Sequence, residues 1–116
     1  MSGGFCYTLE MNNFQTTTHL SEILEESDKR PVIIFKYSNN CRSSDILKTK
    51  LEEKSLNYPI FIVTVQTEPV LSKKITENFE IKHESPQIIV VRNGKVIYTA
   101  HHSQISLNNL YKDKLN

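Results

Sequence analysis

Residues 32–44 read VIIFKYSNNCRSS. The run from Val32 to Lys36 is rich in apolar, β-branched side chains, which is typical of a central strand covered on both faces. A polar loop from Tyr37 to Asn40 follows, and from Cys41 to about Leu56 apolar residues recur at helical spacing. The stretch therefore predicts a buried strand, a short loop and a helix that begins with a cysteine.

The rest of the sequence predicts further helices and strands on both sides of this unit. An amphipathic helix precedes it, with Thr17 or Thr18 as the expected N-cap. Downstream, the Asn93-Gly94 pair favours a two-residue hairpin turn. The elements expected after the cysteine helix are a strand at 60–65, a helix that starts at 67–69 with Val70 on its buried side, hairpin strands at 87–91 and 96–100, and a helix at 106–115.

The order of these elements predicts one α/β domain. Two strand–helix units give a parallel pair of strands through right-handed crossovers, and the hairpin adds antiparallel strands to the same sheet. We therefore expect a four-stranded mixed sheet with helices on both faces, in a domain that spans residues 18–116. Residues 1–17 are polar and are interpreted as an N-terminal arm or edge strand, with Phe5 to Leu9 as the candidate strand.

Size, charge and cysteine content exclude several classes of protein. No apolar run approaches the ~20 residues that a membrane-spanning helix needs, and no secretory signal is visible. The net charge of +1, from 14 basic and 13 acidic residues without a basic block, gives no support to nucleic-acid binding. We expect a cytoplasmic location, where two cysteines are more typical of free, catalytic or sensing thiols than of a structural bridge. Nothing in the sequence indicates the oligomeric state.

Cys41 is the main candidate for a reactive residue. At the start of a helix, free N–H groups and the positive end of the helix dipole favour the thiolate, which is the attacking species. Ser44 lies three residues later, so the pattern is a Cys-x-x-Cys redox site with a hydroxyl in place of the second thiol. On the first helical turn Ser44 can donate to the Cys41 sulfur, but it cannot form a disulfide. The alternatives are a partly buried structural cysteine and an ordinary first-turn serine.

Other residues could assist or accompany this chemistry. Arg42 could steady a thiolate or an acidic group of a substrate, or simply be a solvated first-turn arginine. His83 and Glu84 could face the thiolate, although a surface or capping histidine is the simpler interpretation. Cys6 is interpreted as structural or incidental, or as a partner that resolves a disulfide with Cys41. The adjacent histidines His101 and His102 do not combine with cysteines in a zinc-binding spacing, so no metal site is predicted.

Specific stretches resemble a known family. They are Phe35 to Ser44, Lys82 to Gln87 and Asn93 to Val96, and together they resemble the YtxJ family, the monothiol bacilliredoxins of the bacterial bacillithiol system. The resemblance runs from about residue 18 to the C-terminus, and residues 83–87 are its most specific part. It implies a thioredoxin-like fold and a single reactive cysteine in a Cys-Pro-x-Ser-type site.

Three positions depart from the family pattern to which Cys41 and Ser44 conform. Arg42 stands where the family usually has Pro, Tyr37 where it often has His, and Ser103 where an aromatic residue commonly follows a histidine. The fold expectation does not depend on these positions. The identity of the thiol partner does, because residues next to the cysteine contact the substrate.

Ser85 and Pro86 come directly before a predicted strand. In a thioredoxin-like sheet a proline at this place is usually cis, and its loop faces the reactive cysteine, which leaves the backbone of Ser85 free to pair with an extended substrate. A trans proline at the first residue of a strand is the alternative. The residues expected to bind substrate are therefore Arg42, Ser43, His83, Ser85 and Pro86.

The resemblance implies a specific reaction at Cys41. The thiolate would attack a mixed disulfide between a protein and a low-molecular-weight thiol, bacillithiol or a similar compound, and would take the small thiol onto its own sulfur. The partners would be that thiol and S-thiolated proteins, and no bound cofactor is implied. The alternative is a non-catalytic thioredoxin-like module that binds a protein through the loops around Cys41 and Pro86.

Overall fold

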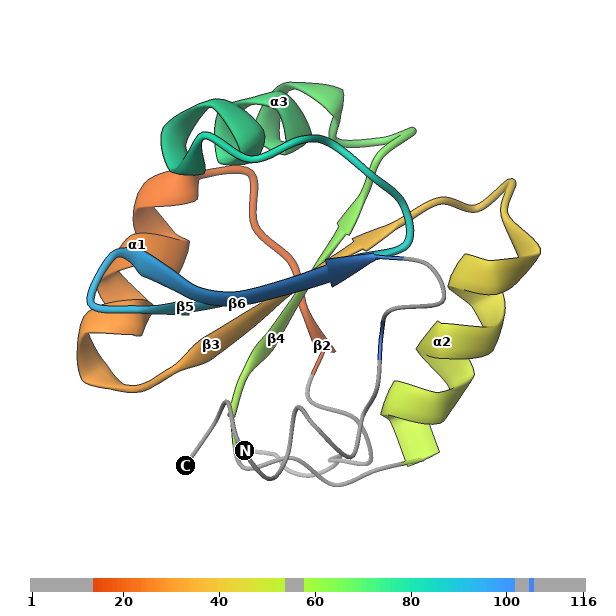
Figure 1. The fold of residues 1–116 in the computed structure, drawn as a ribbon, viewed down its shortest axis with the longest axis horizontal. Helices are drawn as coiled ribbons and strands as arrows, with labels where there is room; N and C mark the ends of the chain where they lie inside the picture. The colour runs from red at the N-terminus through yellow and green to blue at the C-terminus, as the bar shows by residue number, and fades with distance from the viewer. Residues whose placement is uncertain (1–13, 54–57, 102–104, 106–116) are drawn as a thin grey trace, which may run out of the picture.

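Three helices and five strands occupy the described part of the chain in the computed structural model, which comprises residues 14–53, 58–101 and 105 (Figure 1). The predicted strand at Phe5 to Leu9, the predicted helix at 106–115, Cys6, His102 and Ser103 lie outside these residues. The elements in chain order are β2 (Phe14–Gln15), α1 (Leu20–Lys29), β3 (Val32–Tyr37), α2 (Arg42–Glu53), β4 (Ile60–Thr64), α3 (Pro69–Phe79), β5 (Gln87–Arg92) and β6 (Lys95–His101).

The strands form one mixed sheet in the order β2-β4-β3-β5-β6. β2, β4 and β3 run parallel, whereas β5 is antiparallel to both β3 and β6. The prediction of a mixed α/β sheet is confirmed, but the sheet has five strands in this part of the chain instead of four. The additional strand is β2, which is only two residues long, and a segment that short carries no readable alternation of polar and apolar residues.

Helices cover both faces of the sheet, as predicted, with α2 on one face and α1 and α3 on the other (Figure 1). Successive side chains of β3 point to opposite faces. Ile33 and Phe35 therefore pack toward Leu47 and Leu51 of α2. The opposite face joins Val32 and Ile34 to buried residues of the other two helices, Ile23 of α1 and Leu71 and Ile75 of α3.

The sheet register brings two loops to the same edge. Phe35 of β3 lies opposite Ile88 of β5, and Lys36 lies opposite Gln87, in an antiparallel pair. The chain that leaves β3 toward Cys41 therefore departs beside the chain that enters β5 from Pro86. β4 is parallel to β3, so the residues that follow β4 lie at this edge as well.

Two details of the helices correct the predictions. The N-cap of α1 is His19, without a side-chain cap, whereas Thr17 accepts a hydrogen bond from the His19 N–H at 3.1 Å and bonds to Glu22. The start of α2 agrees with the prediction of a helix that starts near Cys41, since Arg42 directly follows it. Val70 is 66% exposed, because the buried stripe of α3 passes through Leu71 and Ile75 at a spacing of four.

The Asn93-Gly94 hairpin turn is confirmed. Both residues have positive φ angles, 53° and 73°, as a two-residue turn of this type requires. The buried Ser27 near the end of α1 fixes the turn, because its carbonyl accepts from the Asn93 N–H at 2.7 Å and its hydroxyl oxygen accepts from the Gly94 N–H at 3.0 Å. None of the helices in the described residues is long and apolar enough to cross a membrane.

Candidate functional site

Cys41 lies in the turn that leads from β3 into α2. Its N–H donates to the Ser38 carbonyl at 3.2 Å, and its own carbonyl accepts the N–H of Asp45 at 3.2 Å, the first hydrogen bond of the helix. Cys41 thus holds the position just before the first turn, where the N–H groups of a helix lack backbone partners. Its thiol is free among the described residues, and the residue is partly exposed.

The surroundings of Cys41 stabilise its thiolate. The largest contribution comes from the backbone N–H of Ser44, which hydrogen-bonds the sulfur and lowers its pKa. Desolvation opposes this effect, and the Ser44 hydroxyl and the N–H and hydroxyl of Ser43 lower the pKa further. The net direction is a pKa below that of an ordinary cysteine thiol. Every contribution that lowers it comes from these two serines, and none comes from Arg42 or His83.

Ser44 has a second contact besides the sulfur. It is 0% exposed, and its hydroxyl oxygen accepts the N–H of Ser38 at 3.2 Å. One hydroxyl therefore connects the first turn of α2 to both ends of the turn that carries Cys41. The serine in place of a second redox cysteine fixes the reactive loop as well as bonding to its sulfur.

Gln66, which follows β4, holds the same loop from the other side. Its side-chain amide donates to the Ser38 hydroxyl at 2.8 Å, and its oxygen accepts the N–H of Asn39 at 3.1 Å. The backbone supports this contact, since the Val65 N–H donates to the Tyr37 carbonyl at 2.9 Å. The loop from Ser38 to Cys41 is thus anchored to both α2 and the end of β4.

Tyr37 connects the end of β3 to the first turn of α2. Its hydroxyl donates to the carboxylate of Asp45, which raises the pKa of the tyrosine. The ammonium group of Lys48 lies 5.4 Å from the centre of the Tyr37 ring, within cation–π range. These contacts fix α2 against the strand that precedes Cys41.

The loop before β5 carries the other predicted substrate-binding residues. The Ser85–Pro86 peptide bond is cis, Pro86 is buried and Ser85 is partly exposed. The buried side chain of Gln87 organises this loop, because its amide donates to the Lys82 carbonyl at 3.0 Å and its oxygen accepts the Glu84 N–H at 3.3 Å.

A buried lysine connects this loop to α3. Lys36 of β3 is 0% exposed, and its ammonium group donates to the Ser72 carbonyl at 2.9 Å and lies 3.0 Å from Nδ1 of His83. Burial lowers the pKa of Lys36 to about 8. Burial, followed by the charge of Lys36, also lowers the pKa of His83, so the imidazole is neutral at neutral pH.

Replacement of Lys36 with methionine is expected to change the pH dependence of stability. In the folded protein Lys36 loses its proton near pH 8, whereas in the unfolded chain it keeps the proton to about pH 10.5. Between these values unfolding takes up a proton, so this group makes the wild type more stable as the pH rises, by up to about 3 kcal/mol. Urea unfolding at pH 7 to 10 measures the effect as a difference between wild type and Lys36→Met.

A matched control is Lys74→Met, which removes an exposed lysine from α3. Its free energy of unfolding should run parallel to that of the wild type at every pH. If the free energy of unfolding of Lys36→Met changes with pH in the same way as that of the wild type, the lowered pKa of Lys36 would be contradicted.

The predicted site residues fall into two groups. Cys41, Arg42, Ser43 and Ser44 lie together at the start of α2, with Arg42 and Ser43 exposed. The other group is the loop before β5, with His83, Ser85 and Pro86. Both groups lie at one edge of the sheet, but His83 contacts Lys36 on the α3 face. The described residues contain no cluster of three histidine, cysteine or acidic side chains suited to a metal ion.

Three residues of the site were not predicted from the sequence: Lys36, Ser38 and Gln66. For Lys36 a signal existed: a lysine at an inward-facing position of a strand expected to be covered on both faces needs a partner inside the protein. Ser38 and Gln66 gave no comparable signal, because polar residues in loops are normally solvated. Their contact depends on how closely the ends of β3 and β4 approach in the folded sheet.

Solved structures with a similar fold include thioredoxins. A protein described as having a thioredoxin fold is 24% identical, with a TM-score of 0.71, over 86% of this chain and 92% of that one. A mutant thioredoxin from Halobacterium salinarum has 13% identity and a TM-score of 0.69, over 94% and 96%. Thioredoxin f from spinach chloroplast has 12% identity and a TM-score of 0.65, over 90% and 94%. At these identities the likeness establishes the thioredoxin fold.

One family of sequences matches most of the chain. The family described as monothiol bacilliredoxin BrxC matches residues 12–110. The match includes both groups of site residues, the start of α2 and the loop before β5. It also begins before β2, so it takes in part of the segment that the sequence suggested was an added arm.

Proposed function

The chain belongs to the monothiol bacilliredoxin BrxC family, and from this membership we propose that Cys41 removes low-molecular-weight thiols from mixed disulfides of proteins. Family and fold together support a thiol–disulfide redox role. The finer proposal concerns the substrate, a protein cysteine joined to bacillithiol or a similar small thiol. The name YtxJ, taken from the resemblance, stays a prediction.

The observation that supports the proposal most strongly is the position of the Cys41 sulfur. The residue is partly exposed, its sulfur lies where the free N–H groups of α2 begin, and the N–H of Ser44 lowers its pKa. A thiolate is the species that attacks disulfides, and a thiol with a pKa close to the ambient pH is the most effective nucleophile. Ser44 supplies no second thiol, so exchange at this site uses one cysteine.

The exchange step balances without an external oxidant. The Cys41 thiolate attacks the sulfur of the small thiol, and a disulfide forms between them as the bond to the protein substrate breaks. The electron pair of the broken bond leaves with the substrate sulfur, which takes a proton from water. A second molecule of small thiol then attacks the small-thiol sulfur of the Cys41 disulfide, which joins the two small thiols in a disulfide and releases the Cys41 thiolate.

The remaining site residues are proposed to bind the substrate. Arg42 and Ser43 are exposed beside Cys41, where they could contact the groups that flank the disulfide. The backbone of Ser85, held before the buried Pro86, is proposed to pair with an extended substrate. We propose that the reaction runs in the cytoplasm, where reducing conditions keep a lone cysteine available.

Intact-mass measurement tests the proposal. The full chain is incubated with a glutathionylated protein and, separately, with a bacillithiolated one. We expect the substrate to lose the mass of the small thiol and Cys41 to gain it, with the faster reaction identifying the preferred thiol. Absence of both an adduct and substrate release would contradict the proposal. If Cys41 stays unmodified while the chain binds the substrate, the alternative of a non-catalytic binding module is favoured.

A further inference from the structure

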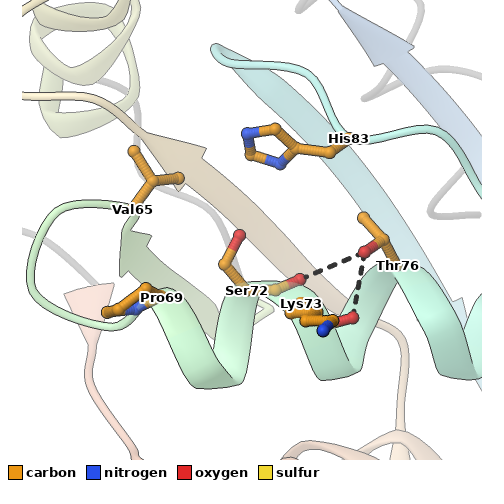
Figure 2. A pocket seen from close by; sticks show the side chains of 6 residues that line it. All are labelled: Val65, Pro69, Ser72, Lys73, Thr76 and His83. Carbon is orange, nitrogen blue, oxygen red and sulfur yellow. Dashed lines mark hydrogen bonds between the residues drawn. The ribbon is translucent and has the colours of Figure 1, made fainter.

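A pocket of about 300 Å³ lies between α3 and the loop before β5. Figure 2 shows the His83 ring on one side and the α3 residues on the other, with the Ser72 hydroxyl pointing from the helix toward the side of the histidine. The lining residues are Val65, Pro69, Ser72, Lys73, Thr76 and His83. The pocket is distinct from the turn that carries Cys41.

The polar groups of this pocket favour an anion. Its lining includes a lysine, a histidine and two hydroxyl residues but no aspartate or glutamate. Thr76 already donates to the Lys73 carbonyl at 2.9 Å, which leaves Ser72, Lys73 and His83 as the groups that can face a ligand. Lys73 also forms an ion pair with Glu77 at 4.0 Å, but at an exposed site such pairs are weak.

The buried Lys36 determines which ring nitrogen of His83 carries the proton. A protonated lysine can only donate, so Nδ1 of His83 accepts from it and the neutral ring carries its proton on Nε2. The ammonium group, 3.0 Å from Nδ1, also adds a positive charge behind the ring. Glu84 acts in the opposite direction on His83, but burial and Lys36 outweigh it.

The pocket adjoins the reactive loop through two consecutive residues. Val65 forms part of its wall, and the next residue, Gln66, holds Ser38 and Asn39 at the start of the turn that carries Cys41. On the other side, His83 lies in the same loop as Pro86. A molecule joined to Cys41 could therefore extend over Gln66 and place a charged group beside His83.

We propose that this pocket binds a carboxylate group of the molecule that forms a disulfide with Cys41. Ser72 and Lys73 donate to the carboxylate, and the Lys36 ammonium group, held between the Ser72 carbonyl and Nδ1 of His83, adds a positive charge beside them. The carboxylate belongs either to the small thiol or to an acidic side chain of the protein substrate. The expected effect of carboxylate binding on the rate of thiol exchange rests on the proposed function of Cys41.

A titration without any sulfur compound tests the binding. The NMR chemical shifts of the His83 ring are followed in the full chain as succinate is added, with uncharged succinamide as the comparison. We expect a saturable shift with succinate alone, and an affinity lower by about tenfold in Lys36→Met and in the surface variant Lys73→Gln. The control Lys95→Gln changes an exposed residue at the start of β6 and should bind like the wild type.

Any of three results of the titration would overturn the inference. These are the absence of a saturable shift with succinate, an equal response to succinamide, and an affinity of Lys73→Gln for succinate equal to that of the wild type. Should Lys36→Met fail to fold, Lys73→Gln decides alone, because it alters only an exposed side chain.

Exchange rates then identify the source of the carboxylate. In one arm, the rate at which Cys41 reacts with dithiodipropionate is compared with its rate with the uncharged bis-hydroxyethyl disulfide. In the other arm, the rates with two peptide disulfides are compared, and these peptides differ only in a glutamate or a glutamine beside the cysteine. A preference for the charged partner that Lys73→Gln reduces supports the inference and names its source.

The two proposals fail in different ways. Equal rates within both arms overturn the pocket inference and leave the proposed function intact. If Cys41 reacts with none of the four compounds, the proposed function fails, and the succinate titration still decides whether the pocket binds carboxylates.

Discussion

The variant Cys41→Ser is expected to lose thiol exchange completely, by at least about a thousandfold in rate, because it removes the nucleophile itself. A serine hydroxyl does not ionise near neutral pH and cannot form a disulfide. The fold should survive, since Cys41 is partly exposed and its backbone makes the hydrogen bonds that start α2. Intact mass after incubation with a glutathionylated protein measures both the adduct and the release of substrate.

The second cysteine provides the control for this variant. Cys6→Ser should retain the full rate if the chemistry needs a single thiol at position 41. Residual exchange in Cys41→Ser, or loss of exchange in Cys6→Ser, would assign the reaction at least in part to Cys6 and contradict the one-cysteine mechanism.

Ser44→Ala is expected to lower both stability and reactivity. Its hydroxyl accepts the N–H of the buried Ser38, and an unsatisfied buried donor costs about 2 kcal/mol. The same hydroxyl bonds the Cys41 sulfur and lowers its pKa, so its loss moves the pKa upward. At neutral pH less thiolate is present, and exchange should slow by up to about tenfold. The backbone N–H of Ser44 remains in the variant, which is why some stabilisation of the thiolate persists.

Urea unfolding and thiolate absorbance measure the two effects of Ser44→Ala separately. Thr49→Ala is a suitable control, because it removes an exposed hydroxyl from the same helix without touching the reactive loop. It should change neither the Cys41 pKa nor the exchange rate. A wild-type pKa in Ser44→Ala would show that the hydroxyl does not act on the sulfur.

The fold could be predicted from the sequence to the extent that each element buries a continuous apolar surface. The strands β3, β4 and β5 are such elements, and the Asn93-Gly94 turn has a specific backbone requirement that few residue pairs meet. β2 could not be predicted, because a two-residue strand exists only through its pairing with β4. The prediction of the N-cap of α1 was wrong for a related reason. Several threonines precede the helix, and tertiary packing determines which residue begins it.

The candidate site could be predicted only where residues are close in the sequence, because their separation along the chain then determines how they lie relative to one another. Cys41, Ser43 and Ser44 lie within one helical turn, so their proximity follows from sequence separation alone. The contact of Lys36 with His83 joins residues 47 positions apart, and that of Gln66 with Ser38 joins residues 28 apart. Such contacts depend on the register of the sheet, which a single sequence does not specify. His83 was therefore found as a candidate, but its partner was not.

The rate of alkylation of Cys41 by iodoacetamide, measured against pH, tests directly whether the folded protein stabilises the Cys41 thiolate. We expect the rate to reach half of its maximum at a pH below the pKa of an ordinary cysteine, about 8.5, because the N–H and hydroxyl groups of Ser43 and Ser44 stabilise the anion. A midpoint at or above that value, or a sulfur that does not react in the folded protein, would contradict it.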